Sequence, residues 1–263
     1  MLAHDPGVRV GNDPEDVHQM RVATRRLRSV LKTASPILDR AWVDEIRSEL
    51  AWLTGELGPA RDLDVLIPYL RGEAASLDPA DRKALAPLFK KLEDGRAVAR
   101  RVVLKALRSE RYLALLAGME AAAAGPPPGG EGSLGAEVEG EFKKLRKAMR
   151  KVEEDPSDEA IHQARIHGKR ARYATELLED ELGKPGVKLL AAAKEFQDAA
   201  GEHHDAVVAE ARIRALLRGV RAQRTALAAG ILVSRQRNRR DAAAAALPKA
   251  WRRYEEAAGR VWA

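Results

Sequence analysis

A short segment near the start of the chain carries cationic side chains at a regular spacing. His18, Arg21, Arg25 and Arg28 follow one another at i, i+3, i+7 and i+10, and we call them the first basic row. On an α-helix these positions lie along one side and extend over about 15 Å. Each arginine presents a planar group that can donate two hydrogen bonds to one phosphate. The first basic row therefore predicts a surface that binds an anion.

The same arrangement recurs in the second half of the chain. Residues 15–31 (EDVHQMRVATRRLRSVL) match residues 159–175 (EAIHQARIHGKRARYAT) after a shift of 144. The resulting second basic row consists of His162, Arg165, Lys169 and Arg172. Cations at this spacing repel one another, yet no acidic residue interrupts the first row between Asp16 and Asp39. A solvated surface is the alternative explanation, but recurrence with a histidine at the head of both rows favours anion binding.

Helices are the elements that must position both rows. Ala, Leu, Arg and Glu dominate the composition, which favours helices, and no segment shows the alternating pattern of a strand. Asp13-Pro14 and Asp155-Pro156 each offer a carboxylate cap followed by proline, which predicts two helix starts. The expected helices span residues 14–38, 41–57, 60–75, 79–108, 110–124, 136–153, 157–182, 186–200, 203–218, 219–246 and 248–261.

Two further matches indicate that the chain arose by internal duplication. Residues 52–66 match residues 195–209 after a shift of 143, which places Arg61 opposite His204. A weaker match sets three arginines against three others: Arg96, Arg100 and Arg101 against Arg235, Arg239 and Arg240. We therefore expect three segments, a first helical repeat, a linker rich in Pro and Gly, and a second helical repeat, at residues 1–124, 125–135 and 136–263.

Composition limits the classes of protein and partner. With 263 residues, of which 45% are apolar, the chain can bury one large core or two smaller ones. The net charge of +7, from 46 basic and 39 acidic residues, favours acidic partners without naming one. The absence of cysteine excludes a disulfide framework and a thiolate metal site. No stretch approaches the ~18 apolar residues that span a bilayer, so we expect a soluble, cytoplasmic protein without membrane binding.

Both rows share the pattern His-Gln-x-Arg-x-x-x-(Arg/Lys)-Arg-x-Arg, which resembles the CHAD family, named for a histidine in an α-helical domain. The resemblance covers about residues 13–262 and includes two Gly-x-x-x-Asp turns, at Gly58–Asp62 and Gly201–Asp205. It implies an all-α fold of two four-helix-type bundles with pseudo-twofold symmetry and a basic central groove. It further implies that the groove binds inorganic polyphosphate. Polyphosphate granules and polyphosphate-metabolising enzymes are then candidate partners.

The resemblance also assigns roles to residues. The polyphosphate-binding set comprises the two basic rows: His18, Arg21, Arg25, Arg28, His162, Arg165, Lys169 and Arg172. A secondary set comprises Arg26, Lys32, Arg96, Arg100, Arg170, Lys194, Arg235 and Arg239. We expect no catalytic residue, no metal and no cofactor, and we expect that the protein is not an enzyme.

Two other functions fit parts of the pattern. A nucleic-acid-binding protein could use the same basic groove, but aromatic residues, which stack on single strands, make up 4% of the chain and do not interrupt the rows. A phosphohydrolase would need a metal-binding acidic cluster or an activated nucleophile, and the sequence offers neither. We therefore expect polyphosphate, rather than nucleic acid, as the partner.

Two short motifs resemble catalytic or metal sites. Glu139, Glu141 and Lys143 form the pattern ExExK of triphosphatases, whose chemistry requires a strand, whereas this segment has a helical pattern. His203, His204 and Asp205 follow one another in the sequence and resemble metal ligands. Neighbouring side chains on a helix, however, point about 100° apart. We expect a structural role for the second motif rather than a metal site.

Overall fold

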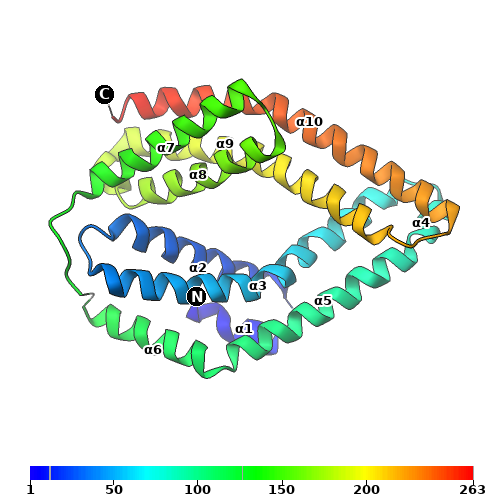
Figure 1. The fold of residues 1–263 in the computed structure, drawn as a ribbon, viewed down its shortest axis with the longest axis horizontal. Coiled ribbons are helices and arrows are strands. Elements are labelled where there is room, and N and C mark those ends of the chain that lie inside the picture. Colours follow the sequence, from blue (N-terminus) through cyan, green and yellow to red (C-terminus); the bar gives the residue numbers. More distant parts are fainter. Residues whose placement is uncertain (12, 126, 263) are drawn as a thin grey trace. The chain divides into compact units, whose positions relative to one another are not determined.

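The computed structural model describes residues 1–11, 13–125 and 127–262 (Figure 1). Asn12, Pro126 and Ala263, which fall in the three expected segments, lie outside the described residues. The described part of the chain is all-α and contains no strand, with only an isolated bridge between Leu38 and Pro128. The chain divides into two compact units, residues 1–132 and 133–263. That these units are copies of one ancestral repeat stays a prediction.

The first unit is built around one long helix. Its elements are a 3-10 helix and six α-helices within the described residues: η1 Leu2–His4, α1 Asp5–Val10, α2 Pro14–Ala34, α3 Arg40–Ala75, α4 Pro79–Ala84, α5 Ala86–Leu107 and α6 Glu110–Ala124. Helix α3 packs against α2, α5 and α6, and Figure 1 shows α4 joining α3 to α5. Leucines of α3, among them Leu50, Leu53 and Leu57, are fully buried because they recur at helical spacing on its covered face.

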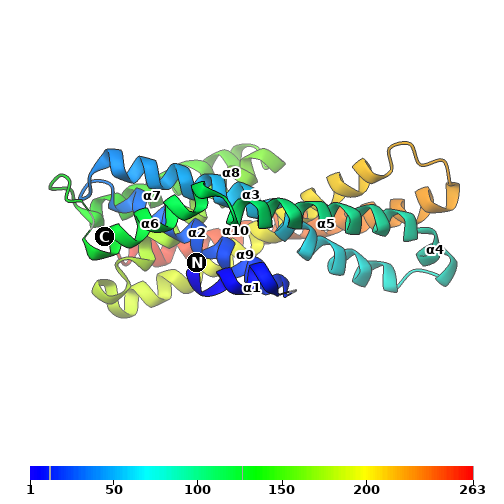
Figure 2. The ribbon, with the colours of Figure 1, turned by 90° about the horizontal axis from the view of Figure 1, so that it is seen from below.

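The second unit contains four helices in its described part: α7 Leu134–Glu154, α8 Asp158–Glu176, α9 Glu179–Leu216 and α10 Gln223–Gly259. An aromatic cluster forms its core, in which Trp251 stacks on Phe142 at 5.8 Å and meets Phe196 edge-on at 6.0 Å. Helix α9 packs along α10, and Figure 2 shows these two helices continuing side by side to the loop that joins them. Buried alanines, including Ala206 and Ala228, line this α9–α10 hairpin.

Two of the differences from the expected helices lie at prolines, and the break expected at residues 201–202 is also absent, because α9 is continuous there. We expected a break near Pro59 and another before Pro248, but α3 and α10 continue through both residues. Proline removes one backbone donor, yet buried residues on both sides of Pro59, Leu57 and Ala60, keep the same face covered. The interruption lies instead at Leu85, which separates α4 from α5.

The helix starts were predicted correctly in one case out of two. The side chain of Asp13 accepts a hydrogen bond from the backbone nitrogen of Glu15 and caps α2. Asp155 is extended and ends α7, whereas the hydroxyl of Ser157 caps α8 by accepting from the nitrogen of Ala160. Pro156 therefore lies before α8 rather than in its first turn, and Ser157 is the next residue whose side chain can cap the helix.

A helix that spans a membrane needs apolar side chains as well as sufficient length. Across the described residues, no helix combines sufficient length with the apolar character that crossing a bilayer requires.

Candidate anion-binding faces

The first basic row lies along α2 beside its buried face. Val17, Met20 and Thr24 turn toward the interior of the first unit, and the four row residues are half-buried next to them. Arg26 is exposed and Lys32 is half-buried on the same helix. Helix α2 therefore carries its cations at the border between core and solvent, where partial loss of water strengthens interactions with charge.

Arg21 connects the row to the backbone of α3. Its Nη1 donates to the carbonyl oxygen of Thr54 at 3.1 Å, and its Nη2 lies 3.7 Å from Oδ1 of Asp62. Asp62 is largely exposed, so this carboxylate compensates the charge of Arg21 only weakly. Burial lowers the pKa of Arg21, and the nearby charges of Arg25 and Arg61 act in the same direction. The guanidinium is therefore held rigidly in a strongly positive environment.

His18 lies within the same group of cations. Partial burial, together with the charges of Arg61, Arg25 and Arg21, lowers the pKa of the His18 imidazole. Arg61 comes from α3, so the first basic face draws on two helices. His18 is thus neutral at pH 7 and can gain a charge when an anion offsets its neighbours.

The guanidinium of Arg25 in the first basic row has hydrogen-bond donors that can bind a ligand. Its Nε is buried without a hydrogen-bond partner, and no carboxylate of the described residues pairs with its guanidinium. Arg28 is also half-buried and follows Arg25 by three residues along the same side of α2. A buried donor without a partner is costly, and an oxygen from a bound anion would satisfy it.

The second basic row lies along α8, where His162, Arg165, Lys169 and Arg172 are all half-buried. Arg172 is engaged within the unit: its Nε donates to Glu176 at 3.1 Å and its Nη1 to Gln197 at 3.2 Å. Nδ1 of His162 lies 3.1 Å from Nδ1 of His204 on α9. His162 and Arg172 therefore already have polar partners within the second unit.

Four of the eight secondary residues bind acids or carbonyls of their own unit, two of them in the first unit. Arg96 pairs with Glu93 at 2.7 Å and lies 4.0 Å from Asp64, in a cavity of about 290 Å³ that Arg100 also lines. Arg100 donates to the carbonyl oxygens of Val8, at 3.4 Å, and Gly11. These contacts attach the N-terminal segment to α5. The side chains are therefore committed to the packing of the first unit.

The same holds for secondary residues of the second unit. Arg239 binds Glu202 through two hydrogen bonds, one of them 2.8 Å long, and the pKa of Glu202 is lowered as a result. Lys194 pairs with Asp198 at 2.8 Å. Arg170 is exposed on α8, and Arg235 is half-buried on α10. The two basic rows, rather than these residues, remain the stronger candidates for binding an anion.

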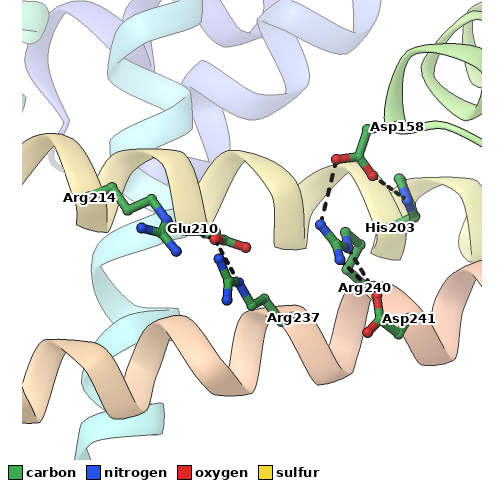
Figure 3. A network of polar contacts seen from close by, with 7 residues as sticks. All are labelled: Asp158, His203, Glu210, Arg214, Arg237, Arg240 and Asp241. Carbon is green, nitrogen blue, oxygen red and sulfur yellow. Dashed lines mark hydrogen bonds and ion pairs between the residues drawn. The ribbon is translucent and has the colours of Figure 1, made fainter.

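A separate ionic network holds the three helices α8, α9 and α10 in place (Figure 3). Asp158 at the start of α8 accepts from Nε2 of His203 at 3.1 Å and lies 3.7 Å from Arg240. Glu210 of α9 accepts from Arg214 at 2.8 Å and from Arg237 at 3.0 Å. His203 is buried, and burial lowers its pKa. The carboxylates of this network therefore stabilise the packing of α8, α9 and α10.

Both short motifs lie within helices, His203 and His204 in α9 and the ExExK pattern in α7. His203 points to Asp158 and His204 to His162, so the adjacent histidines diverge as expected for a helix. No group of three or more His, Asp or Glu residues in the described part of the chain could hold a metal. The ExExK pattern lies in α7, a helix as expected, and there Glu141 pairs with Lys144 at 2.9 Å.

Comparison with known proteins identifies the family of this chain. The family model described as CHAD domain matches residues 1–214. The chain belongs to the CHAD family. Among solved structures, the chain is similar to PptA from Streptomyces chartreusis, with a TM-score of 0.78, 25% identity, and coverage of 91% of this chain and 90% of that one. It is also similar to the CHAD domain from the plant Ricinus communis, with a TM-score of 0.74, 29% identity, and coverage of 95% and 85%.

Curated relatives of this CHAD chain are longer than the chain itself. Two uncharacterized proteins of Mycobacterium tuberculosis, from strains CDC 1551 / Oshkosh and ATCC 25618 / H37Rv, are each 32% identical over 209 residues. The match covers 73% of the CHAD chain and 38% of each relative, so the chain spans about two fifths of their length.

Two residues of the CHAD faces were missed when the rows were read as single helices. Arg61 lies beside His18, and His204 lies beside His162, each contributed by the helix that packs against the row. The alignment of residues 52–66 with 195–209 places these two residues opposite each other, which was the signal available in the sequence. Arg61 and His204 lie in the two Gly-x-x-x-Asp segments, which were expected to be turns. Both segments instead lie inside helices, α3 and α9.

Proposed function

We propose that this CHAD chain binds inorganic polyphosphate without catalysis, through the basic faces of its two units. The observation that carries the proposal is the group of cations around His18. Arg21, Arg25 and Arg61 act on this histidine from two helices, and the carboxylates that oppose them are Glu15, which acts on His18, and the exposed Asp62 beside Arg21. A cluster in which cations outnumber carboxylates attracts a multivalent anion.

The spacing of the first row suits a linear chain of phosphates. The row extends over about 15 Å along α2, so successive phosphates of one polymer can meet successive side chains. Guanidinium groups bind phosphate through paired hydrogen bonds, and Arg25 has a buried Nε that lacks a partner. Membership of the CHAD family, with the polyphosphate binding that the resemblance implies, supports the same choice.

A binding role accounts for the residues near the rows better than a catalytic one. Two carboxylates beside the rows, Asp62 and Glu176, lie against Arg21 and Arg172. A carboxylate that contacts a guanidinium is poorly placed to take a proton from a nucleophile. We therefore propose that polyphosphate binds and leaves unchanged, and that the chain concentrates at polyphosphate granules in the cytoplasm or beside enzymes that act on polyphosphate.

Nucleic acid is the second candidate, and the placement of aromatic residues argues against its single-stranded form. Four of the eleven aromatic residues, Phe142, Phe196, Trp251 and Tyr254, lie in the core of the second unit and are buried. They cannot stack on bases, which single-stranded ligands normally require. Equilibrium competition distinguishes the two ligands: polyphosphate should displace bound DNA or RNA at equal phosphate concentration, and failure to do so would favour nucleic acid.

The direct test is a titration of the full chain with polyphosphates of graded length. The variant His18→Ala/Arg21→Ala/Arg25→Ala should lose at least about tenfold in affinity, because each charge-assisted contact contributes more than 1 kcal/mol. The matched control is Arg101→Ala/Lys105→Ala, which removes two exposed cations from α5. An equal loss in the control would show diffuse attraction to net charge and would contradict a defined site.

A further inference from the structure

The contact between His162 and His204 limits how many protons the two rings can hold. Their Nδ1 atoms are 3.1 Å apart, and the rings stack with centroids 4.7 Å apart at an interplanar angle of 29°. At this distance one Nδ1 must donate a hydrogen and the other must accept it. If both rings were protonated, two N–H groups would face each other and the bond would break. The observed pair therefore carries at most one positive charge.

The surroundings keep His204 neutral at pH 7 in the absence of a ligand. Burial, and then the charges of Arg165, His162 and Lys169, lower the pKa of His204 to about 4. On α9 the adjacent groups are His203 and the exposed Asp205. The cations that α10 presents to this part of α9 are Arg239 and Arg240, which bind Glu202 and Asp158. At pH 7 this part of the second face thus holds its positive charge on Arg165 and Lys169.

The first unit differs at the corresponding position. His18 lies near Arg61, and the alignment sets Arg61 opposite His204. A guanidinium stays charged at every pH at which the protein is folded, whereas an imidazole can be neutral or charged. The first face therefore has a fixed cation where the second face has a group that can gain a proton.

We propose that His204 binds polyphosphate together with His162, and that proton uptake by this pair couples binding in the second unit to pH. The inference rests on the proposed function, because it specifies how one of the two faces meets that ligand. When a phosphate oxygen approaches, one solvent proton is taken up, the pair becomes positively charged, and an imidazolium N–H donates to the oxygen. No covalent bond is formed or broken.

Thermodynamic linkage fixes the sign and the pH range of the effect. A bound phosphate stabilises the charged ring, so the pKa of His204 rises from about 4 when the anion is present. The complex then holds more protons than the unliganded chain, and affinity increases as pH falls toward 4. Each unit by which the pKa rises contributes up to about tenfold in affinity at a pH below both values.

The test measures the affinity of variants of the full chain for a medium-length inorganic polyphosphate at pH 7.5 and 5.0, at constant ionic strength. All variants carry His18→Gln, which removes the titratable group of the first face. The parent should bind about tenfold more tightly at pH 5.0. His204→Gln should lose most of this gain, whereas His204→Arg should bind at pH 7.5 about as tightly as the parent does at pH 5.0. Protonation of the polyphosphate itself is common to all variants and cancels.

Two results separate failure of this inference from failure of the proposed function. If His204→Gln keeps the full pH response of the parent while polyphosphate still binds, the inference is wrong and the proposed function stands. If wild-type protein fails to bind polyphosphate at either pH, both are wrong. Proton NMR of the His204 ring gives a second readout: its pKa should rise by at least about one unit when polyphosphate is added. Circular dichroism should show that every variant is folded.

Discussion

Arg21 and Gly58 fit together across the contact between α2 and α3. A Cβ atom at residue 58 would lie 2.6 Å from Nη1 of Arg21, closer than two such atoms can approach. The missing side chain lets this guanidinium reach the carbonyl oxygen of Thr54. Gly201, which aligns with Gly58, has no atom within 4 Å of the corresponding position. The glycine therefore has a steric role in the first unit alone.

The substitution Gly58→Ala should displace the guanidinium of Arg21 and reduce polyphosphate affinity by about threefold to tenfold, the equivalent of one weakened hydrogen bond. Stability should change little, because alanine favours the helix by up to about 1 kcal/mol and offsets the local adjustment. Titration and urea unfolding measure the two effects. Gly72→Ala, in the same helix with nothing within 4 Å, is the control and should leave affinity unchanged. Equal affinities for both variants would contradict the steric role.

A second glycine should matter for stability. A Cβ at residue 168 would lie 2.5 Å from Cε1 of Phe196, a fully buried ring that cannot move aside. We expect Gly168→Ala to lower the free energy of unfolding by about 1–3 kcal/mol despite the better helix former. Gly140→Ala on α7, where nothing lies within 4 Å, should raise it by up to about 1 kcal/mol. Urea unfolding of both variants provides the measurement, and a stabilised Gly168→Ala would show that α8 and α9 can separate without cost.

The salt dependence of binding should report how many phosphates each face contacts. Polyanion binding releases counterions, so the logarithm of the affinity falls linearly with the logarithm of the salt concentration. Arg25→Ala should reduce the magnitude of this slope by about 0.7–1, because one phosphate contact is lost. Arg101→Ala, an exposed cation on α5, should leave the slope as it is. Titrations at four or five salt concentrations would measure it, and equal slopes for both variants would argue against a direct contact by Arg25.

Stability without ligand should depend on pH through His204. The pKa of this ring is about 4 in the folded chain and near 6.5 when unfolded, so the unfolded state binds more protons between these values. The free energy of unfolding should therefore fall as pH decreases from 6.5 toward 4. The full difference would be about 3 kcal/mol, which solvent around the partly exposed ring reduces to about 1–2 kcal/mol. His204→Gln should show a flatter profile by that amount in chemical denaturation, and parallel profiles would contradict the assignment.

The sequence was sufficient for the fold class and for the helices that carry the rows. Their positions follow from helical spacing and from caps such as Asp13, which are local properties. The continuation of α3 through Pro59 depended on whether neighbouring residues stay buried, and a single helix does not reveal this. The same limit applies to Leu27 and Leu31 of α2, apolar residues that are only partly buried, while Thr24 is fully buried.

The candidate site was predictable along each helix but not between helices. His18 and His162 could be found because each heads a row of its own helix. Arg61 and His204 join the rows from packed neighbours, and that contact exists only in the tertiary structure. From the sequence, Arg96 and Arg100 are suitable for binding an anion. In the structure, however, their guanidinium groups contact nearby acids and carbonyls.

The alanines of the α9–α10 hairpin have a consequence for the cost of ordering it. Ala206, Ala209, Ala228 and Ala229 are all buried, and alanine has no rotamers to lose when it is packed. At these four positions the two helices associate without loss of side-chain conformational entropy, whereas larger buried residues of the hairpin, such as Ile213 and Leu232, each lose about 0.5–1 kcal/mol. The small size of these residues helps the hairpin to stay ordered beyond the end of the aromatic cluster of the second unit.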